Sequence, residues 1–224
     1  MNAADSAAAL YPVHETFHSW QGEGGHLGKS AFFIRLYGCP VRCPWCDSAD
    51  TWDTRRVAAP PSRLSVEALV KEAVAARPEI VVLTGGEPTI HDLAPLANAL
   101  HAAGLPVHLE TCGAFPLRGN FDWVAISPKD AAPPLLDNLI CANELKLIIG
   151  HPDDLPRWSD FLAARSLSAS TSVWLHPEWS RHADPVLLDA ITRWVIARGA
   201  PFRAGWQIHK CYDADEVASR PSQA

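Results

Sequence analysis

The sequence predicts an α/β fold in which one mostly parallel sheet is covered by helices. Short apolar runs rich in β-branched residues alternate with segments of helical periodicity, as in parallel sheets joined by crossover helices. Residues 80–84 and 145–149 are almost continuously apolar, as strands buried on both faces should be. The chain has 224 residues, so we expect one domain spanning residues 1–224.

Seven segments are expected to form strands: residues 31–37, 80–84, 106–111, 123–127, 145–149, 172–176 and 202–208. Three helices are expected, each with a boundary signal. The segment SVEALVKEAVAA has Ser65 as its N-cap, a second helix begins at Asp92 and stops at Gly104, and a third runs from Asp184 to Gly199. The first ten or so residues and the tail from about residue 213 are expected to be flexible.

The charge balance excludes some classes of partner. The chain has 19 Lys and Arg against 25 Asp and Glu, a net charge of −6, whereas phosphate-backbone binding needs a basic face. No apolar run is long enough for a transmembrane helix, and the N-terminus lacks the basic region of a signal peptide. We therefore expect a cytoplasmic protein without nucleic-acid or membrane partners. Cysteines in that compartment bind metals or catalyse more often than they form disulfides.

Three of the six cysteines, Cys39, Cys43 and Cys46, lie within eight residues. Such spacing lets one loop wrap several sulfurs around one centre. Three thiolates on a four-iron cluster leave one iron free to bind a small molecule, so the spacing favours an iron–sulfur centre that takes part in chemistry. A zinc site stays open as the alternative, because its fourth ligand could be His14, His18 or His26.

The segment QGEGGHLGKS superficially resembles a phosphate-binding P-loop. That motif needs a glycine five residues before the Gly-Lys pair, and Glu23 stands there instead. We therefore interpret the segment as a glycine-rich turn between two strands.

With Trp45 before its third cysteine, the cysteine loop resembles that of the radical S-adenosylmethionine (SAM) superfamily, and TGGEP at residues 84–88 resembles the segment that receives the cofactor's methionine part. The segments FHSWQGEG, FFIRLYGC, CDSADTW, ETCG, SPK, ELK and QIHK occur in this order. Together they resemble the 7-carboxy-7-deazaguanine synthases over about residues 12–210. This resemblance implies a partial, shortened TIM-like β/α barrel and a homodimer, with a 4Fe-4S cluster, SAM and Mg²⁺ as cofactors.

The resemblance also implies an activity. It is the radical ring contraction of 6-carboxy-5,6,7,8-tetrahydropterin to 7-carboxy-7-deazaguanine with loss of ammonia, a carbon–nitrogen lyase reaction on the route to queuosine and other 7-deazapurines. An electron donor such as flavodoxin would serve it. Two alternatives stay open. One is an activating enzyme that installs a glycyl radical on a partner protein, although the segments WQGEG and QIHK fit such enzymes poorly. The other is a non-catalytic binding protein whose loop is held by zinc.

The resemblance assigns roles residue by residue, with no side chain as a catalytic group. The cluster ligands are Cys39, Cys43 and Cys46, and the Mg²⁺ ligand is Ser48. The SAM contacts are Trp45, Cys46, Asp47, Gly86, Ser127, Pro128 and Lys129. The substrate contacts are Trp20, Gln21, Gly22, Glu23, Arg35, Thr84, Glu110 and His209. The chemistry suits these groups, because a guanidinium binds a carboxylate bidentately and a carboxylate accepts hydrogen bonds from ring N–H groups.

Overall fold

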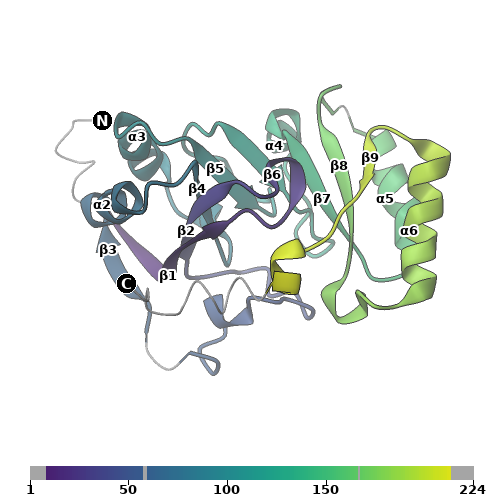
Figure 1. Ribbon diagram of the computed structural model, residues 1–224, viewed down its shortest axis with the longest axis horizontal. Coiled ribbons are helices and arrows are strands. Elements are labelled where there is room, and N and C mark those ends of the chain that lie inside the picture. The colour runs from purple at the N-terminus through teal and green to yellow at the C-terminus, as the bar shows by residue number, and fades with distance from the viewer. Residues whose placement is uncertain (1–8, 58–59, 166, 213–224) are drawn as a thin grey trace.

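The computed structural model describes residues 9–57, 60–165 and 167–212, which form a nine-stranded sheet with helices beside it (Figure 1). The strands are β1 (Leu10–Trp20), β2 (Ser30–Leu36), β3 (Ser62–Ser65), β4 (Ile80–Gly85), β5 (Val107–Thr111), β6 (Trp123–Ile126), β7 (Glu144–Ile149), β8 (Ser172–Pro177) and β9 (Phe202–Ala204). The α-helices are α2 (Val66–Ala76), α3 (Ala94–Ala102), α4 (Leu136–Cys141), α5 (Asp154–Ala163) and α6 (Pro185–Arg198).

The strand order is β3-β1-β2-β4-β5-β6-β7-β8-β9. The pairs from β2 to β9 are all parallel, whereas β1 pairs antiparallel with both β2 and β3. The predicted α/β class with a mostly parallel sheet is therefore confirmed. The order is linear, with β3 and β9 at the two edges, as in a barrel that stays open.

Two apolar cores hold the helices against the sheet. Around Leu69 of α2 and Leu96 of α3, the first core packs on residues of β2, β4 and β5, and the second packs α5 and α6 on β7 and β8. In Figure 1 the helices α2 and α3 lie beside one half of the sheet, and α5 and α6 beside the other. The helices leave the carboxyl ends of the parallel strands free for a site.

The predicted helix boundaries follow from side-chain caps. The Ser65 hydroxyl accepts from the Ala68 amide, and the Asp184 carboxylate accepts from the first amides of α6. The helix α6 ends before Gly199, whose φ is +63°. The start predicted at Asp92 is wrong by two residues, because Asp92 Oδ1 accepts from the Ala94 amide and so forms a turn ahead of α3.

The last predicted strand, 202–208, is wrong beyond Ala204. A Cβ at Gly205 would lie 2.3 Å from the His176 ring, so the chain passes that residue too closely for a side chain. It then leaves the sheet and forms a 3₁₀ helix over Ile208–Tyr212. This segment crosses in front of the sheet toward β1 and β2, where it is drawn in yellow in Figure 1.

Four elements are absent from the prediction: β1, β3, α4 and α5. The strand β1 buries only Tyr11 and Val13, and its residues 14–19, HETFHS, are mostly polar, so it lacked the apolar pattern of a strand. The turn after it fits the glycine-rich interpretation, since the Gln21 amide donates to the Lys29 carbonyl between β1 and β2. Most of the two ends predicted to be flexible lies outside the described residues. Among the described helices, none is long and apolar enough to cross a membrane.

Candidate active site

A cavity of about 280 Å³ opens at the carboxyl ends of the parallel strands. Its walls come from the turn after β1, the cysteine loop after β2, the ends of β4 to β8 and the segment 207–210. Every site residue predicted from the sequence lines it except Pro128. Pro128 is buried between Ser127 and Lys129, which both reach the cavity, and successive side chains of an extended chain point to opposite sides.

The cysteine loop presents all three sulfur residues to the cavity. The Cys46 amide donates to the Cys43 carbonyl, so the loop turns back on itself between the second and third cysteines. Burial raises the pKa of Cys43, and neighbouring Cys46 and Cys39 add to that, while Lys129 opposes it. Among the described residues, no three His, Cys, Asp or Glu side chains converge closely enough to hold one metal ion.

That arrangement suits a cluster better than a single ion. A four-iron cluster spreads its cysteine ligands over several irons, so they need not meet at one point. The three cysteines would hold three irons, and the fourth iron would face the cavity. All three are free thiols in the structure, and all are partly exposed.

The Gly-Gly-Glu-Pro segment, which begins with the last residue of β4, packs directly on the cysteine loop. A Cβ on Gly86 would lie 2.3 Å from the Gly38 carbonyl oxygen and 2.9 Å from Cys39 Cβ, so only glycine permits this contact. The Glu87 amide donates to the same Gly38 carbonyl. The Glu87 carboxylate is 2 % exposed and accepts four hydrogen bonds from the residues Thr89, Thr111 and Cys112. The cysteine loop is thereby tied to the ends of β4 and β5.

Lys129 lies between the cysteine loop and the end of β6. Its Nζ donates to Ser127 Oγ at 2.5 Å and lies 5.2 Å from the centre of the Trp45 ring. Burial lowers the pKa of Lys129, as does Lys146, and Cys43 is among the groups that oppose this shift. The predicted SAM contacts on two separate segments, 45–47 and 127–129, therefore face one another.

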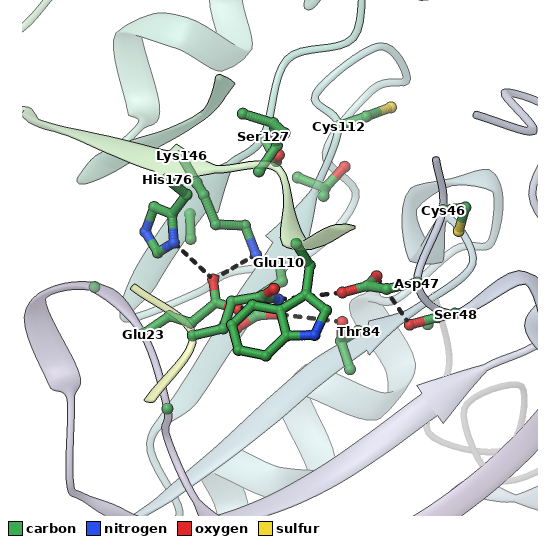
Figure 2. Close-up of a pocket in the computed structure, with 18 of the residues that line it drawn as sticks. Glu23, Cys46, Asp47, Ser48, Thr84, Glu110, Cys112, Ser127, Lys146 and His176 are labelled. Atoms are coloured by element: carbon green, nitrogen blue, oxygen red, sulfur yellow. Dashed lines mark hydrogen bonds and ion pairs between the residues drawn. The ribbon is translucent and has the colours of Figure 1, made fainter. Parts of the chain in front are cut away.

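Three predicted substrate residues form one hydrogen-bonded chain. Gln21 Nε2 donates to Glu110 Oε1 at 2.8 Å, and Thr84 Oγ1 donates to Glu110 Oε2 at 3.2 Å. They come from the turn after β1, from β4 and from β5, and Figure 2 shows Thr84 and Glu110 on the same side of the cavity as Ser48.

Arg35 and Ser48 also meet at the cavity wall. Arg35 Nη1 donates to Ser48 Oγ at 3.4 Å, while its Nε donates to Glu15 Oε1 at 2.8 Å. Ser48 precedes the 3₁₀ helix Ala49–Thr51, but its hydroxyl does not cap that helix. The hydroxyl is thus available to a ligand beside a guanidinium.

Glu23 belongs to a charged cluster that sequence reasoning missed in part. Its Oε2 lies 2.7 Å from Lys146 Nζ and 3.9 Å from His176 Nδ1, and both side chains point at it in Figure 2. Burial opposes the charge of Glu23, yet Lys146, His176 and Gln207 outweigh it and lower the pKa of Glu23 to about 2. Lys146 is the last residue of the quoted segment ELK, and that motif was the only feature of the sequence that pointed to it.

Gln207 and Lys210 stand in the quoted segment QIHK, from which only His209 had been given a role. Gln207 Nε2 donates to Glu23 Oε1 at 2.9 Å and to Asp47 Oδ2 at 3.1 Å. Lys210 Nζ lies 2.8 Å from the same Asp47 oxygen. Burial opposes ionisation of Asp47, but these two partners dominate and hold its pKa well below the usual range. The segment 207–210 therefore joins the turn after β1 to the cysteine loop.

The turn after β1 is held from two sides. Glu144 of β7 accepts from the Gly25 amide at 2.8 Å and from Trp174 Nε1 at 2.9 Å. On the other side, a Cβ on Gly22 would lie 2.1 Å from His209 Nδ1, so the histidine ring packs directly on this glycine. Gln21, Gly22 and Glu23 thus have a defined position over the cavity.

Comparisons with known proteins agree with this geometry. The family model of the Radical SAM superfamily matches residues 33–144. A 7-carboxy-7-deazaguanine synthase from Synechocystis sp. is 45% identical over 200 residues, covering 89% of this chain and 91% of that protein. The enzyme of that name from Escherichia coli is 36% identical over 192 residues, covering 75% and 84%. Among solved structures, the crystal structure of QueE from Escherichia coli superposes with a TM-score of 0.76 at 32% identity, covering 89% of this chain and 95% of that one.

Proposed function

This chain belongs to the 7-carboxy-7-deazaguanine synthases of the radical SAM superfamily, and we propose that it converts 6-carboxy-5,6,7,8-tetrahydropterin to 7-carboxy-7-deazaguanine with loss of ammonia. It is then a radical SAM lyase on the route to queuosine and other 7-deazapurines. One observation carries the proposal: a cluster-binding loop and a set of fixed hydrogen-bonding groups suited to a pterin line the same cavity.

Cys39, Cys43 and Cys46 would hold a 4Fe-4S cluster, and the backbone at Gly86 would meet the methionine part of SAM. When bound, the cluster and SAM supply the one-electron radical chemistry that starts the rearrangement. Lys129 and Ser127 face the cysteine loop from across the cavity and would orient SAM there. The protein's own task is to bind, to orient and to exclude water.

The opposite side of the cavity suits a carboxylated pterin. Gln21, Thr84 and Glu110 form a fixed chain of donors and acceptors, and Glu23 adds an ionised carboxylate. A pterin presents alternating donors and acceptors at its edge, which such groups can match. Arg35 is the cation for the substrate carboxylate, and Ser48 beside it would be a ligand for Mg²⁺, whose remaining oxygens would come from substrate and water.

Three further features belong to the proposal. Residues 1–224 form one domain, which is supported by one sheet that joins every described strand. Two chains form a homodimer, for which the exposed apolar side chains of Leu136 and Ile140 on α4 offer a surface. A flavodoxin-like protein supplies electrons.

The proposal is tested by turnover. The protein is reconstituted anaerobically with iron and sulfide and supplied with SAM, Mg²⁺, a reductant and the carboxytetrahydropterin, and the product is identified by its mass. The expected product is 7-carboxy-7-deazaguanine with one equivalent of ammonia. A fully reconstituted protein that leaves the pterin unchanged would refute the proposal.

A further inference from the structure

Lys146 lies on β7 with its ammonium group inside the cavity, where the function described above gives it no role. Its one ion pair among the described residues is with Glu23, at 2.7 Å between Nζ and Oε2. The side chain of Glu23 is only 11 % exposed and that of Lys146 is 26 % exposed. The pair is thus largely withdrawn from bulk water, where two opposite charges attract more strongly than at a surface.

Lys146 stays charged in this position. Burial lowers the pKa of Lys146, but Glu23, Glu110 and Asp47 raise it more, so its pKa ends above the usual range. His176 on the neighbouring strand is 1 % exposed, and its burial lowers the pKa of His176 to about 4. At neutral pH His176 is therefore uncharged, and Lys146 is the cation that compensates Glu23.

Glu23 is in turn fixed as an acceptor. An ionised carboxylate has about four lone-pair sites and no proton to donate. Oε1 receives Gln207 Nε2 at 2.9 Å. Oε2 is buried and, although close to Lys146, lacks a donor at a hydrogen-bond angle. Because Oε2 is closed off against Lys146, the free acceptor capacity of Glu23 toward the cavity lies on Oε1, which has only one donor among the described residues.

We propose that Lys146 is a positioning residue that acts through Glu23 to make the cavity select a ring edge with two adjacent N–H donors. This inference rests on the proposed function. In a pterin, the exocyclic 2-amino group and the neighbouring ring N–H form such an edge. In the analogue with oxygen in place of the 2-amino group, a carbonyl would face the carboxylate, and two acceptors would repel one another.

Loss of Lys146 would change the character of Glu23 rather than only remove a charge. A carboxylate without its cation in a poorly solvated site takes up a proton, because burial disfavours its ionised form. The protonated Glu23 would turn its O–H toward an N–H donor of the substrate, which is unfavourable. The same O–H could donate to the carbonyl of the 2-oxo analogue. Lys146 thus sets both affinity and the choice between the two rings.

The test compares holoenzymes reconstituted anaerobically: wild type, Lys146→Met, Lys146→Arg and Lys71→Met. Lys71 is an exposed lysine on α2, so Lys71→Met is the matched control. KM and kcat are measured with the carboxytetrahydropterin, and the inhibition constant of the 2-oxo analogue gives binding without turnover. Lys146→Met should raise KM roughly 10- to 100-fold, the equivalent of one charge-assisted hydrogen bond, with kcat nearly unchanged.

The ratio between the two ligands is the decisive readout. Lys146→Met should bind the pterin more weakly but the 2-oxo analogue equally well or better. Lys146→Arg should restore most of the preference for the pterin over the analogue. A double variant, Glu23→Gln with Lys146→Met, leaves no uncompensated charge and should lose no further affinity relative to Lys146→Met.

Three results would overturn the inference: an unchanged KM in Lys146→Met, an equal loss for both ligands, or additive losses in the double variant. The proposed function fails separately, since it requires product from the wild-type enzyme. A wild type that turns over normally beside a Lys146→Met protein with unaltered ligand preference refutes the inference alone.

Discussion

Gln21 Nε2 donates a hydrogen bond of 2.8 Å to Glu110 Oε1, although 89 positions separate the two residues in the chain. Gln21 stands just after the antiparallel strand β1, whereas Glu110 lies on β5 in the middle of the parallel sheet. The contact shows that the turn after β1 reaches across the sheet to the carboxyl ends of the inner strands.

Replacement of Cys39, Cys43 or Cys46 by Ala should abolish the 4Fe-4S cluster or leave a defective one. Each of these residues lines the cavity on one loop, and each replacement would remove the cysteine ligand of one iron. The measurement is iron and sulfide content with the visible absorption spectrum after anaerobic reconstitution. No turnover is needed.

Cys112→Ala and Cys141→Ala are the controls for the cysteine loop. Cys141 is exposed on α4, and burial of Cys112, together with Glu87, raises the pKa of its thiol and disfavours the thiolate that iron needs. Both variants should keep full iron content. Loss of the cluster in Cys112→Ala with retention in Cys43→Ala would show that the ligands are misassigned.

Arg35→Lys should weaken substrate binding while the cluster content stays normal. Lysine keeps the charge but loses the planar fork that lets Arg35 reach both Glu15 and Ser48. The expected loss is about 1.5–3 kcal/mol, the value of one charge-assisted hydrogen bond, seen as a higher KM. Arg63→Lys, at an exposed position on β3, is the matched control. Wild-type affinity in Arg35→Lys would remove Arg35 from the substrate site.

Ser48→Ala should lower turnover and flatten its dependence on Mg²⁺ concentration, whereas Ser48→Thr should behave like the wild type. The alternative role, a hydroxyl that caps the loop through the backbone, finds no support in the geometry, since Ser48 makes no cap hydrogen bond. The hydroxyl lies 3.4 Å from Arg35 Nη1 and 3.5 Å from Asp47 Oδ1 instead. A titration of turnover with Mg²⁺ decides: an unaltered metal response in Ser48→Ala contradicts the metal role.

Stability should fall as the pH drops from about 6.5 toward 4, because of His108. Burial, with His26 and Lys29, lowers the pKa of His108 to about 4, while Asp122 opposes this. In the unfolded chain the imidazole binds a proton near pH 6.5. The unfolded state thus binds more protons in this window, and stability that is complete above it is lost on acidification. The contribution of His108 is at most about 3 kcal/mol.

His108→Gln should make the free energy of unfolding less dependent on pH across that window. The ring packs on His26 at 4.4 Å between ring centres, so the variant also loses some packing at every pH. The measurement is urea unfolding at pH 7.5 and 5 for the wild type, for His108→Gln and for His151→Gln, whose side chain is 62 % exposed. The free energy of unfolding should change less with pH in His108→Gln than in His151→Gln. An equal change in both variants would contradict the role given to His108.

The alternation of apolar runs and helical segments was enough to predict the parallel strands and three helices, because each of those elements buries a face or carries its own cap. Ser65 and Asp184 are local signals, visible without any partner. The strands β1 and β3 lacked such a signal, since β1 buries only Tyr11 and Val13 and gains its place from pairing with β2. The short helix α4 likewise has no side-chain cap.

By itself the sequence determined the chemistry of the site: the spacing of Cys39, Cys43 and Cys46, the Gly-Gly-Glu-Pro segment and the order of the remaining motifs. Such features are set by residue type and by short separations along the chain. Only the tertiary structure decided which charges share the cavity. Lys146 becomes the partner of Glu23, and Gln207 bridges Glu23 and Asp47, through contacts over more than a hundred residues. An ion pair has no sequence pattern of its own, because it depends on distance in space and on burial, and both of these exist only once the sheet has formed.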